Sequence, residues 1–261
     1  MLASDIRPPS LGWRLYSVWY RHMRVYTRNL ISNGLPPFLE PVIFLVGIGL
    51  GLGRYIQAMD NLPYLVFLGT ALPVTSSMFT SAYECTFGTF VRLEYQKAYD
   101  GMVAAPVTVV DLFVGEILWA GSKGTFFSGC VVVVLSSFGA IPMPAGLCAL
   151  PLGFLTGAMF GALSLLVTSF VQNINHFNFY FTGLLSPMFF FSGTVFPIES
   201  IPRALRPLAE LLPLTHAVRL TRSLVVARFS PILLADLAFV AAVIGVAGTF
   251  AIRRLRRRIV V

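Results

Sequence analysis

The chain has 261 residues, of which 56% are hydrophobic and only 11% are charged, and its net charge is +8. Soluble domains carry about 25% charged residues, so this composition excludes an ordinary soluble domain. Together with a mean hydropathy of +0.79, it predicts a single all-α membrane domain over residues 1–261 that contacts membrane lipids and binds no nucleic acid.

The N-terminal residues 10–30 predict an amphipathic helix that lies in the plane of the membrane. Arginines occupy much of this segment, and aromatic residues recur in it at helical spacing, namely Trp13, Tyr16 and Tyr20. Aromatic rings favour the headgroup layer, and arginines favour anionic lipid. The segment lacks the uninterrupted apolar core of a signal peptide, so we expect an interfacial helix that is not cleaved.

Six apolar stretches approach the roughly 20 residues that a transmembrane helix needs. They are residues 37–53, 62–81, 112–138, 147–170, 177–191 and 231–252. Five arginines precede the first stretch and five follow the last. With an even number of spans, this distribution predicts that both termini are cytoplasmic. One connection does not follow this preference of arginine for the cytoplasmic side. Residues 196–230 should be external, and yet they contain five arginines.

Two of these spans carry glycines at a spacing of four residues. The first span has Gly47, Gly49, Gly51 and Gly53, and the fourth has Gly153, Gly157 and Gly161. Small residues at this spacing let helix backbones approach closely in lipid. We therefore expect both stripes to pack against other helices.

The connection between the second and third spans contains the sequence RLEYQKAYD, which predicts a short exposed helix within residues 92–105. A charged helix between two membrane spans has no apolar partner of its own. It is therefore a candidate docking element for a soluble partner, and a solvated loop is the alternative. The candidate docking residues are Arg92, Leu93, Glu94, Tyr95, Lys97, Tyr99 and Asp100.

Charged residues inside a membrane span are costly, and they are therefore candidates for function. Glu40 stands near the start of the first span, directly before Pro41, and Glu84 stands at the end of the second. Both positions fit the cytoplasmic boundary of the membrane. We interpret them as boundary residues, with an intramembrane functional charge at Glu40 as the alternative.

Lys123 has two alternative placements in the third span. If it lies in the middle of the span, it needs a partner, and Glu116 lies two turns earlier on the same face. The ring of Trp119 is a second candidate contact. Alternatively the span begins near Gly124, and residues 111–123 form an interfacial helix with its charges in water.

The sequence contains no recognisable catalytic or nucleotide-binding motif. The nearest approach to a phosphate-binding loop is GSKGT at residues 121–125, in which the lysine precedes the glycine inside an apolar helix. His22, His176 and His216 lie far apart and form no zinc-hydrolase motif, and Ser192 has no histidine near it in the sequence. We expect no catalytic residue, no metal and no cofactor in this chain.

Three cysteines are present, namely Cys85, Cys130 and Cys148. All three lie in or beside apolar segments. Their odd number and the lack of C-x-x-C spacing argue against a metal site. We interpret them as buried apolar thiols.

The stretch FFFSGTVFPIESIP, residues 189–202, interrupts an apolar helix with polar residues, glycine and proline. Each proline removes a backbone donor, and unsatisfied backbone groups in hydrocarbon cost several kcal/mol each. We therefore expect residues 192–213 to form a re-entrant helical hairpin at the outer face, between the fifth and sixth spans, sheltered by protein or water. The residues at its break are Ser192, Gly193, Pro197, Glu199 and Pro202.

Three basic residues follow this hairpin. His216, Arg219 and Arg222 are spaced three apart, which places them on one helical face. Such side chains can bind lipid phosphates or an anionic substrate. Simple anchoring at the headgroups is the alternative.

Several motifs occur in a characteristic order along the chain. They are an E-P pair opening a glycine-rich first span, R-L-E-Y-x-K-x-Y-D-x-M-x-x-x-P, G-E-x-x-W-A, S-P-M-F-x-F-S-G-T-x-F-P and P-L-T-H-A-V-R-L-x-R. This order, which covers essentially the whole chain, resembles the ABC-2 type permeases. Within that family it is most similar to the nodulation protein J branch of lipo-oligosaccharide exporters, and it also resembles daunorubicin-type drug exporter permeases.

The resemblance implies a homodimeric permease of the bacterial inner membrane, bound on its cytoplasmic side to two copies of a separate ABC ATPase subunit that binds ATP and Mg. Residues 92–100 would belong to the coupling helix, and residues 192–213 would be the re-entrant helices at the outer gate. The cargo would be an amphipathic glycolipid, lipo-oligosaccharide or polysaccharide, moved outward along the dimer interface. Aromatic residues within 177–191 would suit its lipid tail or sugar face, with ordinary packing as the alternative.

Other functions remain open at this point. One is a drug or antibiotic efflux permease of the same family. Another is a self-contained ion- or proton-coupled channel or carrier that uses Lys123, Glu116 and Glu40. That function predicts transport without an ATPase and internal symmetry between the two halves, which is not visible in the sequence. A membrane-embedded hydrolase with Ser192 as its nucleophile is the third.

Overall fold

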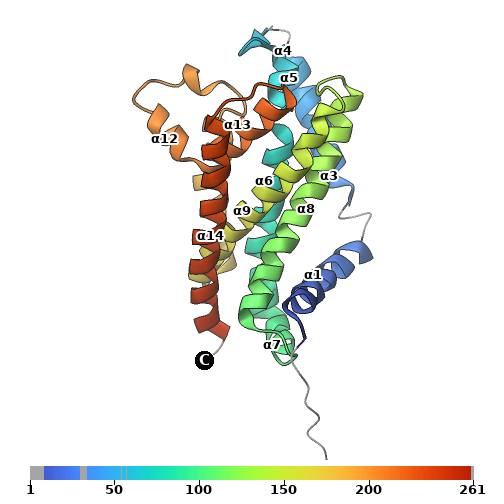
Figure 1. Cartoon of the computed structure of the whole chain (residues 1–261), viewed down its shortest axis with the longest axis vertical. Helices are drawn as coiled ribbons and strands as arrows, with labels where there is room; N and C mark the ends of the chain where they lie inside the picture. The colour runs from blue at the N-terminus through green and yellow to red at the C-terminus, as the bar shows by residue number, and fades with distance from the viewer. Residues whose placement is uncertain (1–8, 30–33, 54, 57, 260–261) are drawn as a thin grey trace, which may run out of the picture.

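A computed structural model of the chain describes residues 9–29, 34–53, 55, 56 and 58–259. Figure 1 shows an elongated helical bundle whose long axis is followed by α6 (Leu72–Tyr83), α8 (Val109–Ser137), α9 (Ala149–Phe170) and α14 (Ile232–Ile259). The short helix α7 (Ala98–Val103) and the end of α14 lie at one end of the bundle, which we call the α7 end. Helix α12 (Arg206–Leu211) lies at the opposite end, which we call the α12 end.

The other elements complete the chain order. Before α6 come α1 (Leu11–Arg28), α3 (Pro36–Phe44), η1 (Leu45–Leu50), α4 (Gly51–Gly53), β1 (Ala58–Met59), β2 (Leu62–Pro63) and α5 (Tyr64–Gly69). Between α6 and α9 come η2 (Glu84–Gly88), η3 (Val91–Tyr95) and η4 (Ala145–Cys148). After α9 come η5 (Ile174–His176), α10 (Phe177–Tyr180), η6 (Phe181–Leu185), α11 (Ser186–Phe191), η7 (Ile198–Ser200) and α13 (Pro213–Val225).

The membrane-protein class predicted from composition agrees with the helix lengths. Among the described residues, four helices are long and apolar enough to cross a membrane, namely Tyr64–Tyr95, Val109–Ser137, Ala145–Phe170 and Ile232–Ile259. They correspond to the second, third, fourth and sixth predicted spans. The fold is mostly helical, and β1 and β2 add a short antiparallel ribbon that pairs Met59 with Leu62.

The first and fifth predicted spans are helical but are not among these four helices of the described residues. Elements α3, η1 and α4 follow one another over residues 36–53. Elements α10, η6 and α11 cover only residues 177–191, and a helix of that length extends about 22 Å, whereas the hydrocarbon core is about 30 Å thick. The helix ends at Phe191, where the sequence predicts a break, and Gly193 adopts a φ of +76°.

Helix α1 matches the helix predicted over residues 10–30. It exposes the aromatic residues Trp13, Tyr16 and Tyr20, and its opposite face packs on α8. A Cβ atom added at Gly115 would lie 2.6 Å from Val18 Cγ1, so this glycine permits the close contact. Trp19 Nε1 also donates a hydrogen bond to Ser122 Oγ, at 2.9 Å.

The third span is a single helix that begins before both predicted starts. Thr108 and Asp111 form a reciprocal capping box at its first turn: the Asp111 backbone N–H donates to Thr108 Oγ1 at 3.2 Å, and the Thr108 backbone N–H donates to Asp111 Oδ2 at 2.9 Å. Asp111 and Glu116 are buried. The alternative in which residues 111–123 form a separate interfacial helix with its charges in water is therefore wrong.

The glycine stripe of the fourth span packs as predicted. Gly153 and Gly157 lie against the backbone of α8, and Ser77 of α6 donates a hydrogen bond to the Gly153 carbonyl at 2.6 Å. The stripe of the first span differs. A Cβ atom added at Gly47 or Gly51 would have no described neighbour within 4 Å, so the close packing predicted there is not made within this part of the chain.

Two of the three cysteines are buried as predicted. Cys85 and Cys130 lie inside the bundle, whereas Cys148 is exposed. The interpretation of Cys148 as a buried thiol is therefore wrong. The reason is that residues Ala145–Cys148 form the short 3-10 helix η4 at the start of the fourth span, and Cys148 does not lie in its interior.

Candidate functional site

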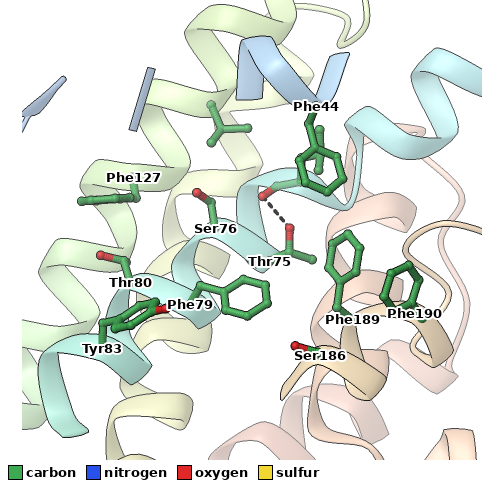
Figure 2. Close-up of a pocket in the computed structure, with 12 residues that line it drawn as sticks. Phe44, Thr75, Ser76, Phe79, Thr80, Tyr83, Phe127, Ser186, Phe189 and Phe190 are labelled. Atoms are coloured by element: carbon green, nitrogen blue, oxygen red, sulfur yellow. Dashed lines mark hydrogen bonds between the residues drawn. The ribbon is translucent and has the colours of Figure 1, made fainter. Parts of the chain in front are cut away.

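A groove of about 560 Å³ opens beside the second apolar span. Figure 2 shows aromatic rings and hydroxyl groups that face this space from several helices. The lining residues belong to α3, α6, α8 and α11, and they are Phe44, Leu72, Thr75, Ser76, Phe79, Thr80, Tyr83, Phe127, Val131, Ser186, Phe189 and Phe190.

Helix α6 supplies half of this lining because the residues concerned repeat at helical spacing. Positions 72, 75, 76, 79, 80 and 83 share one face of a helix. The Thr75 hydroxyl donates to the Leu72 carbonyl at 3.0 Å, but the buried Ser76 hydroxyl has no hydrogen-bond partner among the described residues. The groove thus offers ring faces together with hydroxyl groups, which suits a ligand that has apolar and polar parts.

The aromatic residues predicted to suit a cargo do not form one surface. Phe177 is buried, and the rings of Tyr83 and Phe181 stack with their centroids 4.2 Å apart. Phe179 is 77% exposed and lies outside the groove lining, whereas Phe190 is 49% exposed and lies within it. Part of this set therefore packs the bundle, and only part faces the groove.

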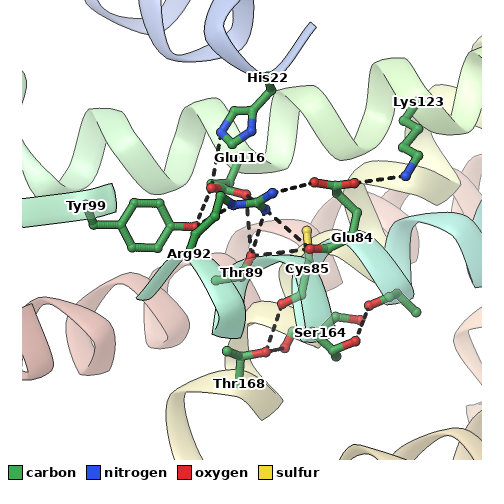
Figure 3. Close-up of polar contacts among 12 residues, drawn as sticks. His22, Glu84, Cys85, Thr89, Arg92, Tyr99, Glu116, Lys123, Ser164 and Thr168 are labelled. Carbon is green, nitrogen blue, oxygen red and sulfur yellow. Dashed lines mark hydrogen bonds and ion pairs between the residues drawn. The ribbon is translucent and has the colours of Figure 1, made fainter. Parts of the chain in front are cut away.

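Four charged side chains form a buried chain of ion pairs between the second and third spans (Figure 3). Arg92 Nη1 lies 2.8 Å from Glu84 Oε1, and Arg92 Nη2 lies 2.8 Å from Glu116 Oε2. Lys123 Nζ lies 2.8 Å from Glu84 Oε2. Two carboxylates thus face two cations. This balance is what makes charged groups tolerable inside an apolar bundle.

Helices α1 and α7 reach the same ion pairs through Glu116. The Tyr99 hydroxyl of α7 donates to Glu116 Oε1 at 2.5 Å, and His22 Nε2 of α1 lies 3.1 Å from that oxygen. Burial, followed by the Glu116 carboxylate, raises the pKa of the Tyr99 hydroxyl well above its usual value, so Tyr99 remains a proton donor. A movement of α7 must therefore disturb the contacts of Glu116.

Lys123 does not pair with Glu116, which was its predicted partner in the mid-span placement. A separation of seven residues places the Cα atoms of Glu116 and Lys123 about 10 Å apart along the helix. The Glu84 carboxylate on the neighbouring helix lies 2.8 Å from Lys123 Nζ. The ammonium group also lies 5.2 Å from the ring centre of Tyr26, which takes the place predicted for Trp119. Glu84 is thus held by ion pairs with Arg92 and Lys123, and its position at the cytoplasmic boundary of the membrane stays a prediction.

The predicted docking residues separate into a buried group and an exposed group. Leu93 and Tyr99 are buried, and the Arg92 side chain is only 13% exposed. The expectation that these three belong to an exposed helix is wrong, because their side chains have partners inside the bundle. The helix is also interrupted, since η3 ends at Tyr95 and Lys97 has a φ of +48° before α7 begins.

The exposed group lies on both sides of this interruption. Tyr95, Lys97 and Asp100 are exposed. Glu94 is half-buried and lies 2.9 Å from Arg258 of α14. The exposed side chains are the part of the predicted docking element that is open to a partner.

His216 and Arg219 share one face of α13 as predicted, but they contact protein groups. His216 Nδ1 lies 2.7 Å from Asp236 Oδ1, and its Nε2 lies 2.9 Å from the Glu210 carbonyl oxygen. Arg219 forms an ion pair with Glu210 and lies 3.5 Å from Asp236 Oδ2. Both side chains are engaged within the protein, so their predicted role as lipid or substrate contacts has no support in this arrangement.

Arg222 reaches further into the α12 end. Its Nε donates to Thr70 Oγ1 at 3.1 Å, and its Nη2 donates to the carbonyl oxygens of Phe67 at 3.1 Å and Gly193 at 2.8 Å. Beside it lies a second cavity of about 180 Å³. Most residues of the predicted helix break line this cavity, namely Ser192, Gly193, Pro197 and Glu199, whereas Pro202 does not.

Some functional contacts were not predicted. His22 carries no sequence signal for its contact with Glu116, because the two residues are far apart in the chain. Asp236 lies inside the sixth apolar stretch, and an acid in such a place is a signal that could have identified it. The backbone of Glu40 lies in α3, but its side chain is outside the described residues. The described residues contain no group of three or more potential metal ligands.

Comparison with known proteins gives a consistent result. Residues 14–226 match the family described as "ABC-2 type transporter". Nodulation protein J of Sinorhizobium fredii (strain NBRC 101917 / NGR234) is 34% identical over 214 residues, which cover 82% of this chain and 82% of that protein. Nodulation protein J of Rhizobium meliloti (strain 1021) is 32% identical, with the same coverage. The inner membrane transport permease YadH of Escherichia coli (strain K12) is 23% identical and covers 78% of this chain and 79% of its own length.

Proposed function

We infer the function from one premise, which is that the chain belongs to the ABC-2 type transporter family. The chain is the permease subunit of a transporter and not an enzyme. Its proposed cargo is an amphipathic glycolipid, lipo-oligosaccharide or polysaccharide, which it moves outward across the bacterial inner membrane. A separate ABC ATPase, present in two copies, binds ATP and Mg and supplies the energy.

The groove between α3, α6, α8 and α11 is the observation that carries this proposal. Its aromatic rings suit acyl chains and the apolar faces of sugars, and its serine and threonine hydroxyl groups, on Thr75, Ser76, Thr80 and Ser186, suit polar groups. The relatives named nodulation protein J support a cargo of this class. An amphipathic drug or antibiotic would meet the same lining and is the alternative cargo.

Phe190 provides a test of the groove. Phe190→Ala removes a half-exposed ring from the lining without opening a cavity in the core, and we expect the concentration of cargo that gives half-maximal export to rise about three- to tenfold, as the loss of one aromatic contact implies. Phe179→Ala is the matched control, because that ring is exposed outside the groove. ATP-dependent cargo uptake into inside-out vesicles measures both variants. Equal effects of the two substitutions would contradict a role of the groove in binding.

The proposed membrane arrangement has six spans, a re-entrant hairpin at residues 192–213 and both termini in the cytoplasm. Support comes from the positions of the helices, because the end of α14 lies at the α7 end and α12 lies at the opposite end (Figure 1). Helix α12 and its flank expose three leucines, Leu205, Leu208 and Leu211. Such a surface suits the lipid layer better than water.

A homodimer is the proposed assembly. The first span leaves apolar side chains exposed on this chain, namely Phe38, Leu39, Ile43 and Val46. Gly47 and Gly51 on the same span have no described neighbour near them. A second copy packed on this span would bury these residues and use the glycines for close approach. Because Phe44 of the same span lines the groove, the interface would then border the cargo path.

The exposed residues around α7 are the proposed contact with the ATPase, with Tyr95 as the largest. Tyr95→Ala is expected to reduce binding of the ATPase subunit at least tenfold, because exposed tyrosines often dominate the energy of an interface. Tyr55→Ala is the matched control, since Tyr55 is also exposed and precedes the β1–β2 ribbon. Co-purification of the cognate ATPase measures the result. Unchanged recovery with Tyr95→Ala would contradict this docking surface.

The ion- or proton-coupled carrier is not favoured. Two of the three residues that it would use, Lys123 and Glu116, are held by ion pairs with Glu84 and Arg92. A proton carrier needs groups that can exchange protons with water during the cycle. Membership of the ABC-2 family also argues against such a carrier, because it implies that a separate ATPase subunit supplies the energy for transport.

A further inference from the structure

Arg222 is a partly buried cation with one unused side. Three of its hydrogen bonds go to Thr70, Phe67 and Gly193, and no described residue accepts a hydrogen bond from Nη1. It forms no ion pair with a described carboxylate, and its guanidinium carbon lies 3.7 Å from the ring centre of Phe67. Burial lowers the pKa of Arg222 to about 10, while Asp60 and Glu199 act in the opposite direction. The side chain is therefore still charged at neutral pH.

Ser192 lies beside the same cavity and is also unsatisfied. The residue is 1% exposed, and its hydroxyl has no hydrogen-bond partner among the described residues. A buried polar group without a partner costs about 1–3 kcal/mol, so such a group needs an explanation. The cavity of about 180 Å³ provides one, because both Ser192 and Arg222 line it.

The other charges at this cavity largely cancel one another. Asp60 lies 3.3 Å from Arg228, and Glu210 forms an ion pair with Arg219. Glu199 is exposed, and solvent screens its repulsion of an anion. Among the described residues at this cavity, Arg222 and Glu199 are thus the charges that form no ion pair, and Arg222 is the less exposed of the two.

We propose that Arg222 and Ser192 form a binding site for an oxyanion, a phosphate or carboxylate group, at the α12 end. Such a group accepts one hydrogen bond from Arg222 Nη1 and one from the Ser192 hydroxyl, so it satisfies both donors and neutralises the charge of Arg222. A lipid headgroup and a free phosphate ion both carry this chemistry. The site goes beyond the transport function proposed above, and its occupancy requires neither the ATPase nor the transported cargo.

The test uses the purified full-length chain in a neutral maltoside detergent, with no ATPase and no ATP. The probes are inorganic phosphate, a short-chain phosphatidic acid and octyl glucoside, which is a neutral amphiphile, and isothermal titration measures their binding. We expect an anionic probe to bind. Ser192→Ala is expected to weaken this binding about tenfold, the effect of losing one hydrogen bond to a charged group, and Arg222→Gln to weaken it more.

Thr194→Val is the matched control. Thr194 also has a buried hydroxyl without a partner, two residues from Ser192, but it does not line the cavity. This variant should bind the anionic probe as the unmodified chain does. Ser192→Ala removes no hydrogen bond made within the described protein, so its melting temperature without ligand should not fall. A loss of binding in Ser192→Ala therefore cannot be attributed to unfolding.

The outcomes distinguish a lipid headgroup from a free anion, and they test the anion site independently of the proposed transport function. Binding of phosphatidic acid but not of inorganic phosphate assigns the site to a lipid headgroup, and equal binding of both assigns it to the free anion. The site is overturned if neither anionic probe binds, if only octyl glucoside binds, or if Ser192→Ala and Arg222→Gln leave binding unchanged. Because ATP is absent, such a result leaves the transport function untested, and a failure of ATP-driven export leaves this site untouched.

Discussion

Arg92→Met is expected to lower the melting temperature of the purified chain by about 10 °C and to abolish export. The substitution removes the cation that holds Glu84 and Glu116 together, each at 2.8 Å. Breaking a buried ion pair on one side typically costs 3–5 kcal/mol, and each kcal/mol shifts the melting temperature by roughly 2–4 °C in a protein of this size. The loss of export follows because Tyr99 of α7 and His22 of α1 meet at the same Glu116 carboxylate.

Two further variants show whether the effect comes from the unpaired carboxylates. Arg256→Met removes an exposed arginine of α14 that forms no ion pair with a described residue, and it should leave the melting temperature within about 1 °C of the unmodified chain. Arg92→Met combined with Glu116→Gln should be more stable than Arg92→Met alone, because one of the two stranded charges is removed. If Arg92→Met melts at the temperature of the Arg256→Met control, the ion pairs do not stabilise this bundle.

Gly124→Ala is expected to lower the melting temperature by several degrees, because α8 has no room for another carbon at this position. An added Cβ atom would lie 2.2 Å from Ser77 Oγ and 2.6 Å from the Gly153 carbonyl oxygen. The second of these is a backbone atom, so relief requires movement of a whole helix. Overpacking of this kind typically costs 1–3 kcal/mol, and the separation of α6, α8 and α9 would also disturb the groove that α6 lines.

Gly129→Ala on the same helix is the matched control. An added Cβ atom at Gly129 meets nothing within 4 Å among the described residues. Alanine is a better helix former than glycine by up to about 1 kcal/mol, so this substitution should leave the melting temperature unchanged or raise it. The pair thus separates packing from helix propensity. A stabilising effect of both substitutions would contradict the close packing of α8 against α9 at Gly124.

Hydropathy correctly predicted the spans that are long, uninterrupted apolar stretches. Four apolar stretches became helices long enough to cross a membrane, because a run of about 20 apolar residues has few other stable arrangements in lipid. The fifth stretch, residues 177–191, is helical but short. Its proline and glycine neighbours correctly predicted where the helix ends, and the path of the chain beyond it depends on tertiary contacts that the sequence does not encode locally.

The ion-pair partners could not be predicted in this way. Lys123 and Glu84 are 39 residues apart and meet at 2.8 Å, and this contact depends on how α6 and α8 are rotated against each other. Sequence reasoning favours partners on the same helix, which is why it selected Glu116. The composition of residues 92–100 led to a wrong prediction for the same reason. Their many charged residues predict an exposed helix, whereas Arg92 and Tyr99 have partners inside the bundle.

The proposed function requires that a separate ATPase drives transport through this chain. The most direct measurement reconstitutes the purified chain in proteoliposomes, with and without the cognate ABC ATPase, and follows a fluorescent lipid-linked oligosaccharide across the bilayer. We predict movement only when the ATPase and ATP are both present, and none when a proton gradient is imposed on the chain alone. Movement driven by the gradient without the ATPase would contradict the proposed function and would support a self-contained carrier.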